Sequence, residues 1–293
     1  MLKESTRRRL HDGVHVVPTL VSLGNFLCGL ASIACALKAS SLLVTTPAGG
    51  YALPPEWGHL IYVAAMLICF AMVCDLLDGR IARMTGSDSP FGAEIDSLAD
   101  VVSFGIAPAV LVGALAPAMP FAAKYVWVPA AAYATFAAMR LARYNVEKGV
   151  QHPLRFSGLP SPAAAGAVVS LVMLYTVLRF GEHRDLAVAK YASQLIKGLP
   201  LYMLLLGLLM VSRVRYSHLS RKVLSGHKPF RHVVALVLVI AFAWMELEFT
   251  LAAGFTLYVA YSIAVYLYAK LVRREVADDE AETETEDTAP DRP

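Results

Sequence analysis

Long apolar segments separated by short polar ones make up most of the chain. Each apolar segment approaches the roughly 20 residues that a helix needs to cross a bilayer. The pattern predicts membrane-spanning helices over residues of about 18–37, 59–83, 91–115, 125–145, 159–180, 199–214, 232–247 and 249–271. We therefore expect an all-α polytopic membrane protein with about eight transmembrane helices.

The predicted spans divide the chain into four parts. Residues 1–17 form a basic, partly apolar segment, which favours an interfacial helix along the inner leaflet. Residues 18–215 contain the first six spans, and residues 216–274 add two more, joined by a tight hairpin. Residues 275–293 are acidic and lack apolar periodicity, so we expect a disordered tail. The basic start precedes an apolar segment that lacks a small-residue cleavage site, which predicts a retained first helix rather than a removed signal.

Composition agrees with the membrane class. Hydrophobic residues make up 57% of the chain and charged residues 17%, whereas a soluble domain carries about 25% charge. The cysteines all lie inside apolar segments, so we interpret them as small core residues rather than a disulfide framework or a metal site. They are Cys28, Cys35, Cys69 and Cys74.

The net charge of +3 hides an asymmetry along the chain. Residues 275–293 hold nine acids and one arginine, a charge of −8, which leaves +11 on residues 1–274. We expect this basic part to face anionic lipid headgroups and not nucleic acid, since no soluble domain is predicted. Lys and Arg are enriched on the side that carries both termini and the turn after the second span. The positive-inside rule places that side in the cytoplasm, although the loop after the fifth span also carries basic residues.

Four aspartates flank the turn between the second and third predicted spans. Asp75 and Asp78 are three residues apart, and Asp96 and Asp100 are four apart, so each pair lies on one helix face. Two apolar helices joined by a short turn are antiparallel neighbours, which brings the pairs to the same end. Single acids at helix ends are ordinarily part of a solvated turn. A set of four at these spacings favours a functional site.

Carboxylates this close repel one another and lose solvation at the apolar end of a helix. Divalent cations remove both costs, and an all-oxygen site without His or Cys suits Mg²⁺ or Mn²⁺. Gly79 leaves bare backbone one turn beyond Asp75, and the guanidinium of Arg83 follows one turn later. Bare backbone beside a guanidinium is suited to a phosphate. The pattern therefore predicts a site for metal and phosphate together.

This stretch resembles the signature of the CDP-alcohol phosphotransferase family, D-x2-D-G-x2-A-R-x8-G-x3-D-x3-D. Every fixed position is matched, by Asp75, Asp78, Gly79, Ala82, Arg83, Gly92, Asp96 and Asp100. The resemblance implies a six-helix catalytic core and transfer of a phosphatidyl or phospho-alcohol group from a CDP-linked donor to an alcohol, with release of CMP. It also implies that two copies of the chain form a homodimer.

Four further strings resemble the phosphatidylserine synthase branch of that family: residues 18–26, 97–109, 140–145 and 158–163. They favour transfer from CDP-diacylglycerol to the hydroxyl of L-serine, and Arg140, Arg143 and Asn145 are the candidate acceptor-binding residues. Arginines at such positions are also common as membrane anchors. One alternative is a sister transferase that uses glycerol phosphate, inositol phosphate or choline. In that case Arg80 or Arg155 would bind the phosphate of a phosphorylated acceptor. A more remote alternative is a cation transporter.

By the family's logic, Asp75, Asp78 and Asp96 hold one divalent ion, and Asp100 shares in a second ion and acts as the general base. We further predict that four residues bind CDP-diacylglycerol. Gly79 and Arg83 contact the nucleotide phosphates, Ser89 on the turn assists them, and Asn25 contacts the cytidine end.

Overall fold

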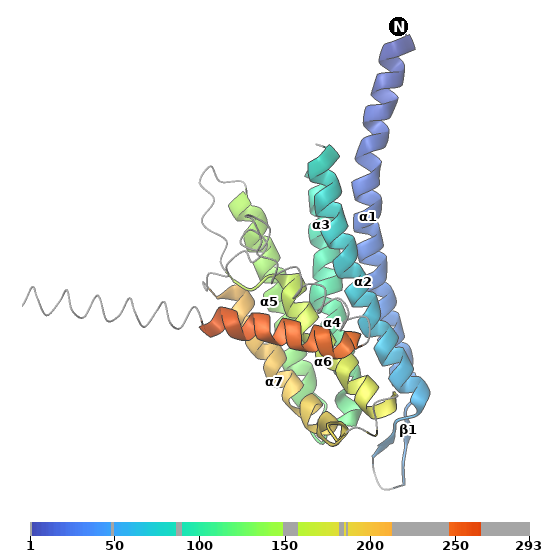
Figure 1. Cartoon of the computed structure of the whole chain (residues 1–293), viewed down its shortest axis with the longest axis vertical. Helices are drawn as coiled ribbons and strands as arrows, with labels where there is room; N and C mark the ends of the chain where they lie inside the picture. The colour runs from blue at the N-terminus through green and yellow to red at the C-terminus, as the bar shows by residue number, and fades with distance from the viewer. Residues whose placement is uncertain are drawn as a thin grey trace, which may run out of the picture.

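The computed structural model describes residues 2–47, 50–85, 90–148, 158–181, 185, 187–212 and 246–264. Nearly all of these residues are helical (Figure 1). The α-helices are α1 (Leu2–Ser41), α2 (Pro55–Thr85), α3 (Pro90–Asp100), α4 (Ala107–Ala114), α5 (Lys124–Lys148), α6 (Ser161–Phe180) and α7 (Ala192–Val211). A further helix, Leu247–Ala264, follows along the chain. Shorter elements are the π-helical η1 (Val101–Ile106) and two 3-10 turns, η2 (Ala116–Ala118) and η4 (Ala189–Tyr191).

Six segments of the described chain are long and apolar enough to cross a membrane. They include the predicted first, second, third, fifth and sixth spans, together with Leu247–Ala264. The predicted fourth span is α5, a helix of 25 residues that packs against α4, η1 and α7. This arrangement confirms an all-α polytopic membrane protein. The predicted seventh span, residues 232–247, lies almost entirely outside the described residues, as does the acidic tail.

The first helix differs from the prediction. The prediction of a separate interfacial helix before a span that starts at Pro18 is wrong, because α1 is one continuous helix of 40 residues. Residues 2–17 contain no proline, and their three Arg, two Leu, one Lys and one Glu favour helix, so the helix can extend beyond the apolar segment.

The sixth span also begins earlier than predicted. The prediction started at residue 199, where continuous apolarity begins, but α7 starts at Ala192. Ala192, Ile196 and Leu199 are all buried and follow the i, i+4, i+7 spacing of one helix face. The polar residues between them occupy the other face, so the first two turns are amphipathic rather than fully apolar.

A small hairpin joins α1 to α2. Strands β1 (Val44–Thr45) and β2 (Tyr51–Ala52) pair antiparallel, with Val44 opposite Ala52. The second helix then starts at Pro55, whose fixed φ and missing N–H suit a helix start. Figure 1 shows α2 rising from the hairpin and α3 and α4 returning beside it. The turn between α2 and α3 therefore lies at the opposite end of the bundle from the hairpin.

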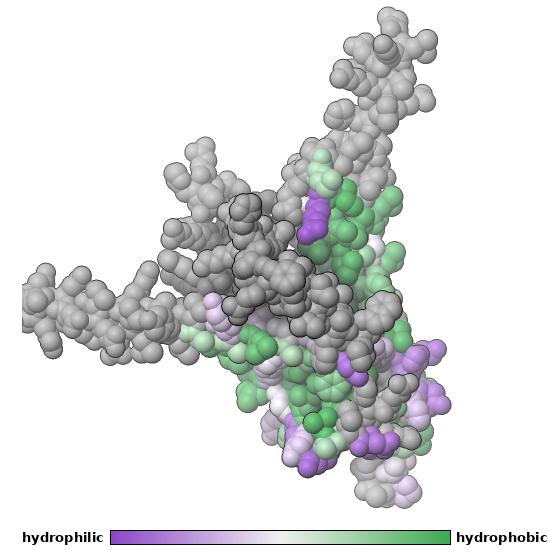
Figure 2. All heavy atoms as spheres, in the orientation of Figure 1, coloured by the Kyte–Doolittle hydropathy of each residue, from purple (hydrophilic) through white to green (hydrophobic). Residues whose placement is uncertain are grey.

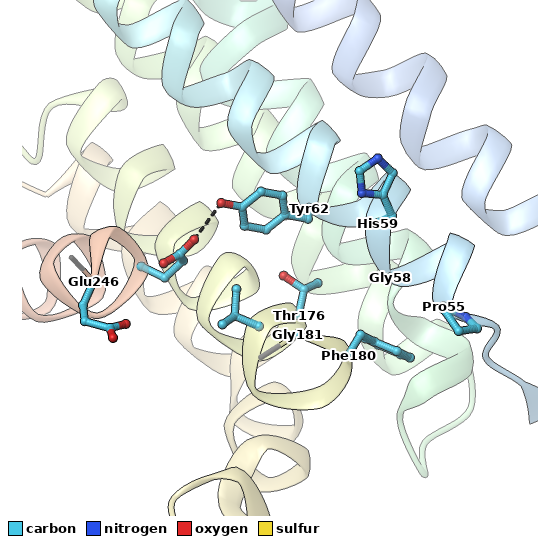
Figure 3. A pocket seen from close by; sticks show the side chains of 10 residues that line it. Pro55, Gly58, His59, Tyr62, Thr176, Phe180, Gly181 and Glu246 are labelled. Carbon is cyan, nitrogen blue, oxygen red and sulfur yellow. Dashed lines mark hydrogen bonds between the residues drawn. The ribbon is translucent and has the colours of Figure 1, made fainter. Parts of the chain in front are cut away.

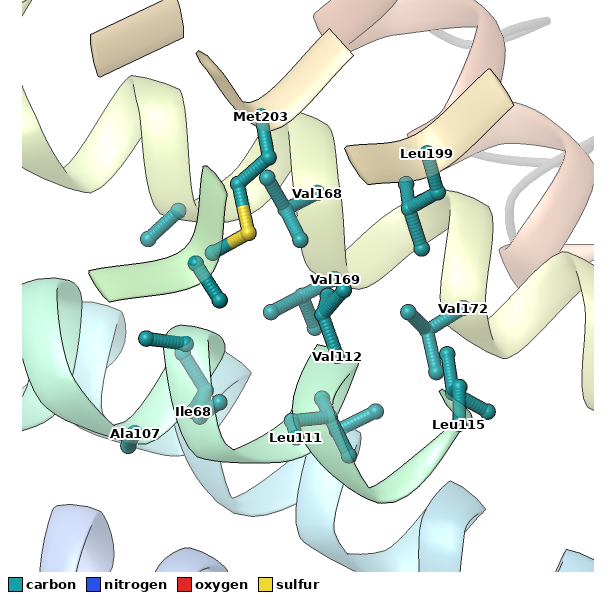
Figure 4. Packing of buried hydrophobic residues seen from close by; sticks show 14 of the residues in the cluster. Ile68, Ala107, Leu111, Val112, Leu115, Val168, Val169, Val172, Leu199 and Met203 are labelled. Carbon is teal, nitrogen blue, oxygen red and sulfur yellow. The ribbon is translucent and has the colours of Figure 1, made fainter. Parts of the chain in front are cut away.

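The core lies where α2, α4, α6 and α7 meet. Ile68, Leu111, Val169 and Met203 are fully buried and interlock there (Figure 4). By contrast, the outer faces of α1 and α2 are apolar yet exposed, as the hydrophobic surface in Figure 2 shows. Leu27, for example, is 62% exposed. Exposed apolar helix faces are expected where lipid is the solvent.

A π-helical segment interrupts the third span directly after Asp100. The N–H of Ala107 donates to the carbonyl of Val102, five residues back. Pro108 has no N–H to give the carbonyl of Phe104, and that carbonyl accepts the Tyr133 hydroxyl at 3.0 Å instead. The altered turn thus sits beside the predicted site, where such segments are frequently found.

Candidate active site

Three of the four predicted aspartates come together at the turn end of α2 and α3. Carboxylate oxygens of Asp75, Asp96 and Asp100 all lie within 4.8 Å of one another. Asp96 and Asp100 occupy successive turns of α3, and Asp75 approaches from α2. Asp75 and Asp100 lie six and nine residues inside the ends of their apolar segments, about 9 and 14 Å along the helix axes. The group is therefore set inside the membrane-spanning part of the helices.

Asp78 is placed differently from the other three. It is buried, and its carboxylate accepts a hydrogen bond from the hydroxyl of Ser22 on α1. It stays close enough to Asp75 for the two charges to interact. The structure thus ties Asp78 to α1 and leaves it outside the three-residue group, so its role as a metal ligand stays a prediction.

The helix α1 also reaches Asp100. The Nδ2 amide of Asn25 donates to Oδ1 of Asp100 at 3.2 Å, and the Asn25 carbonyl accepts the Ser103 hydroxyl at 2.9 Å. Asn25 is fully buried, and its Oδ1 has no hydrogen-bond partner among the described residues. The predicted contact of Asn25 with cytidine stays untested. What the structure adds is a direct contact with the candidate base.

The predicted acceptor residues approach from α5. Nη1 of Arg140 donates to the Ser161 hydroxyl at 3.0 Å, and the Arg140 charge interacts with Asp100. Nδ2 of Asn145 donates to the Ser97 hydroxyl at 3.0 Å. Arg143 is partly buried in the next turn after Arg140. Arg140 is therefore coupled to the aspartate group through its charge, and Asn145 is tied to α3 through Ser97.

These contacts connect the four strings that sequence comparison singled out. The first string is linked to the second through Asn25, the second to the third through Ser97, and the third to the fourth through Arg140. The fourth string is fixed by Gly158, which has a φ of +94° and lies against the end of α7. A side chain there would be strained and would collide with the Met210 carbonyl. Residues far apart in sequence thus form one polar network.

The predicted nucleotide-binding residues are only partly described. Gly79 is exposed on α2, one turn beyond Asp75. Arg83 belongs to the same helix, but its side chain lies outside the described part of the structure. Ser89 and Arg155 also fall outside the described residues. Their predicted contacts with phosphate stay predictions.

The residues present fit a hard divalent cation. The group offers three carboxylates and no nitrogen or sulfur ligand, which is the donor set that Mg²⁺ and Mn²⁺ prefer. The buried Asn25 oxygen supplies a further polar atom beside it. Packing three carboxylates into an apolar helix end without such an ion would be costly.

Comparison with known proteins identifies the family of the chain. The family model for CDP-alcohol phosphatidyltransferase matches residues 15–206, so the chain belongs to that family. Among curated relatives, the CDP-diacylglycerol--serine O-phosphatidyltransferase of Helicobacter pylori strain J99 is 34% identical over 216 residues, 72% of this chain and 83% of the relative. The protein of the same name from Methanocaldococcus jannaschii is 35% identical over 157 residues, 54% of this chain and 65% of the relative. That from Bacillus subtilis is 32% identical over 163 residues, 55% and 78% of the respective chains.

Proposed function

We propose that the protein is a CDP-diacylglycerol–serine O-phosphatidyltransferase. It transfers the phosphatidyl group of CDP-diacylglycerol to the hydroxyl of L-serine and releases CMP. The observation that carries the proposal is the link between the aspartate group and Arg140, a cation suited to an acceptor that brings a carboxylate. The shared activity named for relatives from bacteria and an archaeon supports the same acceptor.

The aspartates are proposed to make the enzyme metal-dependent. Asp75, Asp96 and Asp100, with Asp78 beside Asp75, would hold two divalent ions, Mg²⁺ or Mn²⁺, which when bound neutralise the pyrophosphate and polarise the phosphorus under attack. Gly79, Arg83 and Ser89 are proposed to bind the nucleotide phosphates from the turn side, where the charge of a guanidinium and bare backbone complement phosphate oxygens.

Asp100 is the proposed general base. Serine forms a bond from its hydroxyl oxygen to the phosphorus that carries diacylglycerol, and the bond from that phosphorus to the CMP oxygen breaks. The hydroxyl proton passes to the Asp100 carboxylate. Asn25 fixes the orientation of that carboxylate through its amide, so proton transfer can accompany attack even though a carboxylate is a weak base.

Arg140 is proposed to pair with the serine carboxylate. Its Nη1 is held by Ser161, while its buried Nε has no hydrogen-bond partner among the described residues. A buried guanidinium nitrogen without a partner is costly, and a bound carboxylate would satisfy it. Arg143 and Asn145, on the following turns of α5, are the further proposed acceptor residues.

The site is proposed to face the cytoplasm, with both termini on the same side, because Lys and Arg are enriched there. A cytoplasmic opening suits a nucleotide donor. The diacylglycerol chains of the donor would reach the site sideways from the bilayer, and the product phosphatidylserine would stay in it. Homodimer formation remains a prediction from the family.

An acceptor assay tests the proposal. Purified protein in detergent with CDP-diacylglycerol and Mn²⁺ or Mg²⁺ is given serine, glycerol phosphate, inositol phosphate or choline, and CMP release is followed. We expect release with serine and only background with the others. Release with glycerol phosphate, inositol phosphate or choline in place of serine would instead assign a sister transferase.

A further inference from the structure

A buried stripe of small residues on α1 faces the helices that carry the aspartates. Its members are buried and recur at the three- and four-residue spacing of one helix face: Ser22, Asn25, Gly29 and Ser32. Through the first two of these residues, α1 bonds Asp78 and Asp100 from outside the pair formed by α2 and α3. Whatever fixes the rotation of α1 therefore also affects the placement of those two carboxylates.

Ser103, one turn after Asp100 in η1, contacts this stripe through a hydrogen bond between helices. A serine within a helix commonly donates to a carbonyl of its own helix one turn back, as Ser170 does to Ala167. The Ser103 hydroxyl instead crosses to α1 and donates to the main-chain carbonyl of Asn25 at 2.9 Å. Ser103 and Asn25 are both fully buried, so water does not compete for this bond.

Gly29 makes the crossing bond possible. It lies one turn after Asn25, where a side chain would cover the Asn25 carbonyl. A Cβ at Gly29 would fall 2.4 Å from the Ser103 Oγ, too close for two atoms that are not bonded. The missing side chain thus lets α1 and η1 approach until the hydroxyl reaches the carbonyl.

We propose that Ser103 is a positioning residue for Asp100. Its bond to the Asn25 carbonyl holds α1 in the rotation that keeps the Asn25 amide on the Asp100 carboxylate, 3.2 Å away. The inference rests on the proposed function, in which Asp100 takes the proton of the acceptor hydroxyl. Ser103 acts through Asn25 and not on the reacting atoms.

Two other hydrogen bonds between helices serve as matched controls. The Ser32 hydroxyl, on the same stripe, donates to the Ala64 carbonyl of α2 at 2.8 Å and is also fully buried. The second bond lies near the start of α2, about 20 Å along that helix from its aspartates. There the Tyr62 hydroxyl donates to Oε1 of Glu248 at 2.6 Å (Figure 3). Glu248 belongs to the helix Leu247–Ala264, which Figure 1 shows in orange-red, running across the other helices rather than along them.

The test compares Ser103→Ala with Ser32→Ala and Tyr62→Phe. Each variant loses one hydrogen bond between helices, so each should melt below the wild type in detergent. Ser103→Ala alone should also lower kcat, by about threefold to tenfold, with KM for serine and for CDP-diacylglycerol within about twofold of the wild type. A kcat in Ser103→Ala no lower than in the two controls would overturn the inference.

A double-variant cycle separates positioning from a general loosening of the bundle. Asn25→Ala removes the amide that contacts Asp100 but keeps the main-chain carbonyl that accepts the Ser103 hydroxyl. In that background Ser103→Ala should lower kcat no further, because no amide is left to position. Losses that multiply would show that Ser103 acts independently of the Asn25 amide and would contradict the inference.

Failure of this inference can be told apart from failure of the proposed function. A wild-type protein that releases CMP with another alcohol and not with serine overturns the proposed function alone. The variants are then measured with that alcohol, and Ser103→Ala should still have a lower kcat than Ser32→Ala. Equal values would overturn the role of Ser103 as well.

Discussion

Three kinds of group surround Asp100: the Asn25 amide of α1, carboxylates of α2 and of its own helix α3, and the charge of Arg140 on α5. These neighbours fix the position of the carboxylate, which matters most for a weak base that acts through its placement. Asp100→Asn keeps the shape of the side chain and removes its ability to take a proton.

We expect Asp100→Asn to lower kcat by about 100-fold or more, the usual contribution of general-base catalysis. CDP-diacylglycerol binding should be retained. Glu94→Gln, an exposed acid on the same helix, is the matched control and should behave as the wild type. Serine-dependent CMP release near wild-type levels in Asp100→Asn would remove it as the base.

The variant Asn25→Ala distinguishes two roles for Asn25, positioning of Asp100 and binding of cytidine. If Asn25 positions Asp100, the variant should have a kcat about tenfold below that of the wild type, since a hydrogen bond to a charged group contributes about 1.5–3 kcal/mol. As a ligand for cytidine, it should instead raise KM for CDP-diacylglycerol. We predict the first result, measured by steady-state kinetics with each substrate varied in turn. A change confined to KM for the donor would contradict it.

At the scale of elements, the π-helical segment after Asp100 depends on a bond from another helix. The Tyr133 hydroxyl satisfies the Phe104 carbonyl, and both residues are fully buried. Tyr133→Phe leaves that carbonyl without its donor, which costs about 1–3 kcal/mol. We expect a lower melting temperature in detergent. Tyr125→Phe, at a side chain that is 61% exposed, should melt with the wild type, and a Tyr133→Phe protein that does so too would refute the proposed bond.

The sequence predicted the meeting of Asp75, Asp96 and Asp100 because helical spacing and a short turn determine it. It did not predict that Asp78 bonds Ser22 or that Asn25 bonds Asp100. Those pairs join helices more than fifty residues apart, and their contact depends on how α1 is rotated against its neighbours. Periodicity places a residue on a helix face but leaves that rotation open.

Other elements were predictable only in part. The signal for the π-helical segment was Pro108, a missing donor within an apolar span, but the hydroxyl that replaces it comes from α5. The early start of α7 was hidden because its first turns are amphipathic. The crossing path of Leu247–Ala264 could not be predicted either, since an apolar segment of 18 residues has the length and composition of an ordinary transmembrane helix.

For the whole molecule, the charge bias makes a topological prediction. Alkaline phosphatase, which is active only outside the cytoplasm, should be inactive when fused after residue 293 and active when inserted in the hairpin between β1 and β2. The opposite pattern would reverse the orientation of the aspartate site. Activity at neither or both positions would contradict an odd number of crossings between them.

The central claim is that the carboxylates at the end of α2 and α3 serve a metal-dependent transfer to serine. The most direct measurement is serine-dependent CMP release from CDP-diacylglycerol by purified protein, before and after treatment with EDTA and after adding back Mn²⁺ or Mg²⁺. We predict that release falls to background after EDTA and returns with the ion in the wild type, but not in Asp96→Asn. Undiminished release after complete removal of divalent ions would contradict the claim.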